Sequence, residues 1–259
     1  MIPKVIHYCW FGGNPKSEII ETCIASWKMY CPDWEIKEWN ESNYDVNAHP
    51  YMKEAYEAKK WAFVTDVARL EIIARYGGVY MDTDVELLNS VDALMEHDAF
   101  FFFETDRNIA SGLGFGAAAG HGTVKAMLAV YDDRHFLVNG KPDLSPCPAK
   151  NTEALRDLYP AFMRNGKTQY LDGTAILSCG DYASFARHHG TMSWVDGHKG
   201  SHIYKDTKLK RILRKPEYFD WIEQHLGKKA TAVYTFAVYD LLEMGPVYYV
   251  KRIIHKLRK

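Results

Sequence analysis

The 259-residue chain is 47% apolar and 25% charged, with a net charge of −1. This length supports a sizeable core without disulfides or a structural metal, and the near-neutral charge argues against nucleic acid as a partner. The five cysteines are odd in number and form no Cys-x-x-Cys pair, which favours a reducing, cytoplasmic location. No apolar run approaches the roughly 20 residues that a membrane-spanning helix needs.

The N-terminal part is predicted to form a strand–helix–strand unit. Residues 4–10 are rich in β-forming side chains and begin so early that we expect no signal peptide. Ser17 can cap a helix whose apolar residues recur at helical spacing, and Pro32-Asp33 ends that helix. Residues 34–39 alternate apolar and polar side chains as a strand does. Such a unit begins a parallel sheet covered by helices.

The next segment contains the clearest helix of the chain. Residues 60–76 carry one apolar stripe, and Gly77-Gly78 follows as a helix C-terminus prefers. Residues 79–81 then predict a short strand that runs directly into the triplet Asp82-Thr83-Asp84.

Further elements continue the alternation of strands and helices. Residues 99–103 predict a buried strand and residues 123–131 a helix. Between them, residues 111–122 are rich in Gly and Ala and predict a tight loop that something approaches closely. Residues 139–150 hold three Pro and are expected to be irregular. The fold class is therefore α/β.

Charge divides the chain into two predicted domains, 1–204 and a basic helical appendage at 205–259. The first holds 19 Lys and Arg against 27 Asp and Glu, and the second holds 13 against 6. Residues 230–259 interleave apolar and basic side chains, which favours peripheral contact with the anionic cytoplasmic face of a membrane. The alternative is that this segment packs on the first domain. Cosedimentation with anionic vesicles separates the two.

Two segments at strand ends are candidates to bind a ligand. In open α/β sheets, ligands bind beyond the carboxyl ends of the strands. Residues 10–13 and the triplet both follow predicted strands. In an extended segment Asp82 and Asp84 point the same way, and two such carboxylates are costly unless a cation neutralises them. A hard divalent cation suits these oxygen ligands.

Asp66 and Arg69 lie three residues apart on the helix that precedes the triplet. They occupy neighbouring positions of one helical face and flank the apolar stripe, so they can border a pocket. The alternative is a surface ion pair, which contributes little.

Three segments together resemble glycosyltransferase family 32. They are residues 2–13 (IPKVIHYCWFGG), residues 66–84 (DVARL, then RYGGVYMDTD), and residues 188–194 (HHGTMSW). The family includes bacterial capsular-polysaccharide transferases and fungal mannosyltransferases, and the same pattern is similar to the clostridial glucosylating toxins. The chain departs from the family at Gly190, where an aromatic residue usually follows the two histidines.

The resemblance implies a GT-A type, Rossmann-like α/β domain and a retaining, metal-dependent hexosyltransferase. Its cofactor would be Mn²⁺ or Mg²⁺, and its donor a nucleotide-sugar, with UDP favoured over GDP. The implied acceptor is a glycan or lipid-linked glycan, in bacterial capsular or surface polysaccharide synthesis.

The resemblance also implies roles for residues at the donor site. Trp10 would stack on the nucleobase, and Asp66 and Arg69 would hold hydroxyls of the donor sugar. Tyr80 would line the ribose or sugar pocket, and Asp82 would contact the ribose or sugar.

Metal binding is implied for the triplet and for the late motif. Asp84 would bind the ion directly, with Asp82 and His189 as further ligands. His188 or His189, together with Ser193 and Trp194, would close over the diphosphate.

Three other interpretations stay open from the residues alone. A zinc cluster could join His188 and His189 to His198 and His202. A glycoside hydrolase could use Asp82 and Asp84, but such acid–base pairs lie ~5–10 Å apart, usually on separate elements. A non-catalytic glycan-binding module could use the aromatics, although sugar binding alone does not require paired aspartates suited to a diphosphate-bound metal.

Overall fold

A computed structural model describes residues 1–190, together with 221, 222, 224–226 and 230. The chain divides into two compact units, Met1–Ser201 and His202–Lys259. In the second unit, His225 Nδ1 donates a hydrogen bond of 2.8 Å to the carbonyl of Trp221 within a helical turn. Several sequence predictions fall outside the described residues, namely the late-motif residues Ser193 and Trp194, the zinc candidates His198 and His202, and most of the appendage 205–259.

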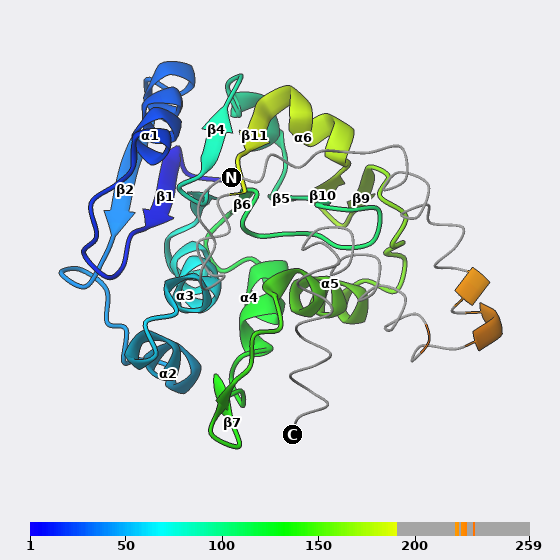
Figure 1. The fold of residues 1–259 in the computed structure, drawn as a ribbon. Coiled ribbons are helices and arrows are strands. Elements are labelled where there is room, and N and C mark those ends of the chain that lie inside the picture. Colours follow the sequence, from blue (N-terminus) through cyan, green and yellow to red (C-terminus); the bar gives the residue numbers. More distant parts are fainter. Residues whose placement is uncertain (191–220, 223, 227–229, 231–259) are drawn as a thin grey trace, which may run out of the picture. The chain divides into compact units, whose positions relative to one another are not determined.

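A seven-stranded sheet forms the centre of the first unit (Figure 1). Its order is β2-β1-β3-β6-β5-β10-β9. Five strands run parallel, whereas β6 and β9 are antiparallel to their neighbours. The strands are β1 (Val5–Cys9), β2 (Glu35–Trp39), β3 (Gly78–Tyr80), β5 (Ala99–Phe102), β6 (Phe115–Ala117), β9 (Gln169–Leu171) and β10 (Thr174–Leu177).

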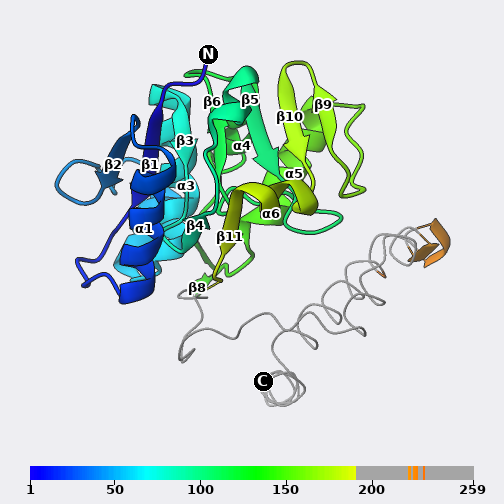
Figure 2. The same ribbon diagram turned by 90° about the horizontal axis from the view of Figure 1, so that it is seen from above.

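Helices cover both faces of this sheet (Figure 2). One core layer holds residues of α2 (Pro50–Glu57), α3 (Trp61–Tyr76), α4 (Gly122–Ala129) and α5 (Cys147–Leu158). The opposite layer holds residues of α1 (Glu18–Tyr30), α6 (Cys179–Phe185) and the 3-10 helix η1 (Asp92–Glu96). Strand β5 shows the alternation, because Phe101 enters the first layer while Phe100 and Phe102 enter the second.

Two small antiparallel pairs complete the unit. Strand β4 (Val85–Leu87) pairs with β11 (Ala186–His188), and β7 (Leu137–Val138) pairs with β8 (Lys141–Pro142). Among the described residues, no helix is both long and apolar enough to cross a bilayer.

The structure confirms the α/β class and the strand–helix–strand opening. Strands β1 and β2 and helices α1, α3 and α4 lie within a residue or two of the predicted ranges. Helix α3 ends at Gly77, whose φ of +67° suits glycine.

The prediction of a loop over residues 111–122 is wrong at its centre. Residues 115–117 form β6, a strand in the interior of the sheet. Phe115 and Ala117 are fully buried, and Gly116 lies against the Phe100 ring, where a Cβ would clash. The small residues that suggested a loop therefore serve close packing within a sheet.

The prediction of irregular structure over residues 139–150 is only partly right. Helix α5 begins at Cys147 and tolerates Pro148 in its first turn, because the amide that proline lacks has no helical acceptor there.

His7, at the centre of β1, is buried as a neutral imidazole. Its Nε2–H donates to the Gly77 carbonyl at 3.0 Å, and its Nδ1 accepts from the Trp39 indole at 3.0 Å. Burial, opposed by the bond to Gly77, lowers the pKa of His7 from 6.5 to about 4. Protonation at Nδ1 would also break the bond from Trp39.

We predict that His7 makes the protein lose stability as the pH falls from 6.5 towards 4. In this window the unfolded chain binds a proton that the folded chain does not, and the full effect is about 3 kcal/mol. Urea unfolding of wild type and His7→Gln at pH 7, 6, 5 and 4.5 measures it. The unfolding free energy should fall less steeply in the variant; parallel curves would contradict the assignment.

Candidate active site

The triplet Asp82-Thr83-Asp84 connects β3 to β4 beyond the carboxyl end of β3. It forms a turn, in which the Val85 amide donates to the Asp82 carbonyl at 3.0 Å. The predicted extended conformation is therefore wrong, because the chain must reverse into β4. The two carboxylates still interact: burial and the charge of Asp84 raise the pKa of Asp82, and Arg69 opposes them.

Side chains of α1 hold the strand that follows the turn. The indole of Trp27 donates to the Val85 carbonyl at 2.8 Å, and Ser26 Oγ accepts from the Leu87 amide at 2.9 Å. Both side chains are buried. The position of the triplet therefore depends on a helix that lies about 60 residues earlier in the chain.

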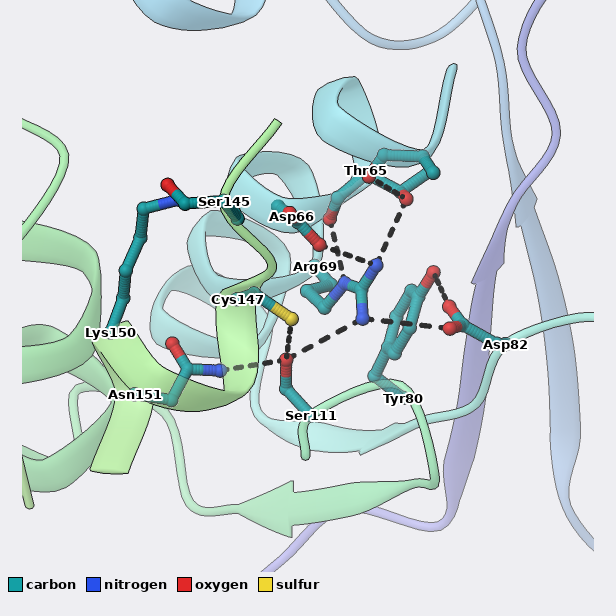
Figure 3. A network of polar contacts seen from close by, with 11 residues as sticks. Thr65, Asp66, Arg69, Tyr80, Asp82, Ser111, Ser145, Cys147, Lys150 and Asn151 are labelled. Carbon is teal, nitrogen blue, oxygen red and sulfur yellow. Dashed lines mark hydrogen bonds and ion pairs between the residues drawn. The ribbon is translucent and has the colours of Figure 1, made fainter. Parts of the chain in front are cut away.

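Arg69 is the centre of a buried polar network (Figure 3). Its Nε donates to the Thr65 carbonyl at 2.9 Å, and its Nη2 donates to Thr65 Oγ1 at 3.0 Å. The same Nη2 lies 3.0 Å from Asp66 Oδ1, while Nη1 lies 3.6 Å from Asp82 Oδ2. Arg69 and Asp66 are 3% and 6% exposed, so the alternative of a surface ion pair is wrong.

Two carboxylates thus share one guanidinium. Burial raises the pKa of Asp66 and of Asp82, and the positive charge of Arg69 opposes this in both. Tyr80 places its ring 5.2 Å from the Arg69 guanidinium and donates its hydroxyl to Asp82 Oδ1 at 2.9 Å. The network joins the sugar-binding residues expected on α3 to the first aspartate of the triplet.

The sequence analysis missed three residues that belong to this network, Ser111, Cys147 and Asn151. Ser111 Oγ accepts from Arg69 Nη1 at 3.5 Å and from Asn151 Nδ2 at 2.9 Å, and the thiol of Cys147 lies 3.8 Å from the same oxygen (Figure 3). Burial raises the pKa of Cys147, so the thiol stays protonated. The Gly-rich stretch indicated that another part of the structure packs closely near Ser111. Helix α5 was not predicted, so Cys147 and Asn151 on it were missed.

Gly112 packs against two members of the network, Asp82 and Arg69. A Cβ at this position would overlap the Asp82 carboxylate and come within 3.2 Å of Arg69 Nη1. Its carbonyl also accepts from the Asp82 amide at 3.3 Å. Only glycine leaves the Asp82 carboxylate in this position.

Trp10 follows β1, the strand beside β3, so its loop and the triplet leave the same edge of the sheet. The ring is half-buried, donates from Nε1 to the Asn14 carbonyl at 2.7 Å, and has the Lys16 ammonium 5.4 Å from its centroid. The loop is held at Gly12, whose amide donates to Glu41 Oε1 at 2.6 Å. The nucleobase role of Trp10 stays a prediction.

The two histidines of the late motif contact different carboxylates. His188 Nε2 lies 3.2 Å from Asp84 Oδ1, whereas His189 Nε2 lies 2.9 Å from Glu86 Oε2. Burial lowers the pKa of His188, but the bond to Asp84 and the charges of Asp84 and Asp82 outweigh it and raise the pKa to about 9. The sequence prediction named His189 as the ligand; the structure places His188 at the triplet.

The chemistry of these donors fits a divalent cation. Asp82 and Asp84 are oxygen donors at one turn, beside the His188 imidazole. No cluster of three or more His, Cys, Asp or Glu suited to a metal is found in the part of the chain that the structure describes. An ion such as Mg²⁺ needs only one or two carboxylates when substrate phosphates supply other ligands.

Comparison with known proteins finds a family with a similar region. Residues 17–101 match the family described as "Glycosyltransferase sugar-binding region containing DXD motif", and this stretch contains Asp66, Arg69 and the Asp82–Asp84 triplet. Residues 17–101 are therefore similar to the sugar-binding region of DXD glycosyltransferases. The resemblance to family 32 is thereby confirmed.

Two proteins from Schizosaccharomyces pombe are similar to this chain. Inositol phosphoceramide mannosyltransferase 3 is 28% identical over 127 residues, covering 46% of this chain and 34% of the relative. Inositol phosphoceramide mannosyltransferase 1 is 28% identical over 131 residues, covering 46% and 40%. The chain therefore spans well under half the length of these curated relatives.

A solved structure shares the fold. The chain is similar to PaToxG glycosyltransferase with a TM-score of 0.50 and 16% identity, over 61% of this chain and 70% of that one. The predicted GT-A type fold is thereby confirmed.

We predict that Arg69→Met destabilises the protein by about 3–5 kcal/mol, because it leaves the buried Asp66 and the partly buried Asp82 without their cation. Arg156→Met is the matched control; Arg156 pairs with Asp157 at 3.4 Å, with both side chains exposed, and its loss should cost under about 1 kcal/mol. Urea unfolding measures both. Equal losses would show that Arg69 contributes no more than a surface charge.

We predict that Gly112→Ala weakens binding of a nucleotide diphosphate with Mn²⁺ by at least about 10-fold, because the new methyl group displaces Asp82. Gly122→Ala is its control, since a Cβ there meets nothing within 4 Å. Isothermal titration calorimetry gives the affinities and thermal unfolding checks the fold. Wild-type affinity in Gly112→Ala would mean that the Asp82 position is not needed.

Proposed function

We propose that the chain is a retaining, metal-dependent hexosyltransferase that uses a nucleotide-sugar donor, with UDP favoured over GDP. One observation carries the proposal. Arg69 links Asp66 on α3 to Asp82 of the triplet in a single buried network, and Asp84 lies two residues further on beside His188. The residues suited to a sugar and those suited to a diphosphate-bound ion thus belong to one site.

Residues on α3 and β3 would bind the sugar and ribose of the donor. Asp66 and Asp82 are buried or partly buried carboxylates, which accept strongly from hydroxyl groups when ionised. The charge of Arg69 opposes the burial that raises the pKa of both carboxylates, and its planar fork fixes their orientation. The Tyr80 hydroxyl holds Asp82 by a hydrogen bond. Trp10, at the end of the neighbouring strand, would stack on the nucleobase.

Asp84, with Asp82, would hold the divalent ion, and the His188 imidazole would lie beside it. A bound Mn²⁺ or Mg²⁺ would neutralise the charge of the departing diphosphate. The turn and the pairing of β4 with β11 fix Asp84 before a donor arrives, so little reorganisation is needed on binding.

We propose retention of configuration through attack on the face from which the diphosphate leaves. The acceptor oxygen bonds to the anomeric carbon as the bond to phosphate breaks, and the departing phosphate oxygen takes the acceptor's proton. Asp66 and Asp82 are both engaged with Arg69, which suits them to holding hydroxyl groups rather than to attacking carbon.

For the acceptor we propose a glycan or lipid-linked glycan. The S. pombe relatives are named inositol phosphoceramide mannosyltransferases, which makes mannose the first donor sugar to test. A cytoplasmic role in bacterial capsular or surface polysaccharide synthesis, with residues 230–259 at the membrane surface, rests on the sequence alone.

The test is a donor screen with purified protein. UDP- and GDP-hexoses, mannose included, are incubated with Mn²⁺, Mg²⁺ or EDTA, and nucleotide release is measured for wild type, Asp84→Asn and the exposed control Asp157→Asn. We expect metal-dependent release of one nucleotide that Asp84→Asn lowers by about 100-fold or more and Asp157→Asn leaves unchanged. NMR of the product gives its anomeric configuration.

Three other outcomes of this screen would contradict parts of the proposal. Inverted configuration would exclude the same-face mechanism. Cleavage of simple glycosides without a nucleotide would indicate a hydrolase. Glycan binding without turnover of any nucleotide-sugar would indicate a binding module on an inherited fold.

A further inference from the structure

His188, the last residue of β11, and His189, the next residue, have separate partners. His188 Nε2 lies 3.2 Å from Asp84 Oδ1, and His189 Nε2 lies 2.9 Å from Glu86 Oε2. Neighbouring residues of a strand point to opposite faces, so one alignment of β11 cannot present both rings to the same atom. The alignment of β11 along β4 therefore decides which histidine reaches the triplet.

The pairing of β4 with β11 sets this alignment. Ala186 lies opposite Leu87, Arg187 opposite Glu86, and His188 opposite Val85. The His189 amide then donates to the Asp84 carbonyl at 2.9 Å, which extends the pairing to the triplet itself.

The pairing of β4 with β11 is short. Within the described residues, β4 and β11 form a two-stranded sheet of three residue pairs, and such ribbons are marginal without further support. The end remote from the triplet is tied by the Phe185 carbonyl, which accepts from the amides of Leu88 and Asn89 at 2.8 and 3.2 Å.

Glu86 ties the end next to the triplet. Its Oε2 contacts His189 Nε2 at 2.9 Å and also lies 3.5 Å from Arg187 Nη1. The Glu86 and His189 side chains are 23% and 24% exposed, so water screens their bond less than it screens a pair on the open surface. The Glu86 carboxylate thus contacts both residues that flank His188 in the sequence, Arg187 and His189.

We propose that Glu86 is a positioning residue of the donor–metal site: by binding His189 it aligns β11 so that His188 faces Asp84. This inference rests on the proposed function. It assigns His188 to the diphosphate beside Asp84, and it gives His189 the role of fixing the position of the strand.

Calorimetry of Mn²⁺ binding in the presence of UDP or GDP tests the proposal. We expect Glu86→Ala and His188→Gln to weaken this binding by about 10- to 100-fold. His189→Gln, whose amide can still donate to Glu86, should stay within about 3-fold of wild type, and Glu86→Gln should lie between Glu86→Ala and wild type.

Glu54→Ala is the matched control. Glu54, on α2, also accepts from a histidine, His135 Nδ1 at 2.6 Å, and from a backbone amide, that of Leu137 at 2.9 Å, so its loss removes a comparable pair away from the triplet. It should leave the affinity unchanged. A loss in Glu54→Ala equal to that in Glu86→Ala would reduce Glu86 to a structural role and overturn the proposal. A loss in His189→Gln as large as in His188→Gln would overturn it in favour of His189 as a ligand.

Hydrogen exchange of the apo protein separates failure of this inference from failure of the proposed function. In Glu86→Ala the amide of His189 should exchange faster, whereas in Glu54→Ala it should not. Unchanged protection of His189 in Glu86→Ala would overturn the inference. A wild-type protein that binds no nucleotide with metal, while Glu86→Ala still loses this protection, would refute the proposed function and leave the role of Glu86 in aligning β11 intact.

Discussion

The buried guanidinium of Arg69 fixes the positions of three segments at the candidate active site. Arg69 needs negative partners because a charge inside a protein is costly unless it is paired and hydrogen-bonded, and it obtains them from Asp66 on its own helix and Asp82 beyond β3. Ser111 fills the remaining donor position from a third segment. One side chain thereby holds α3, the triplet and the loop before β6 in a fixed relation.

The other aspartate of the triplet depends on a different set of contacts. Asp84 lies in a turn whose following strand is held by Trp27 and Ser26 of α1 on one side and by β11 on the other. The contacts that hold Asp84, the proposed metal ligand, and those that hold Asp66, proposed for the donor sugar, therefore lie on opposite faces of the sheet. They meet only because the turn between β3 and β4 crosses its carboxyl edge.

The matched sugar-binding region, residues 17–101, accounts for only part of the site. It contains Asp66, Arg69 and the triplet, whereas Ser111, Gly112, Asn151 and the two histidines come from the segment that follows. Within this later segment, His188 contacts Asp84, Gly112 lies against Asp82, and Ser111 contacts Arg69. They are where we expect differences in donor and acceptor choice to arise.

Local patterns in the sequence were enough for the α/β class, for α3 with its Gly77 end, and for the pairing of Asp66 with Arg69. These depend on periodicity and on spacing within a few residues. Tertiary structure alone decided that this pair is buried, that residues 115–117 form an interior strand, that the triplet turns, and that His188 rather than His189 faces Asp84. Each of these depends on which distant segments pack together, and no short stretch of sequence records that.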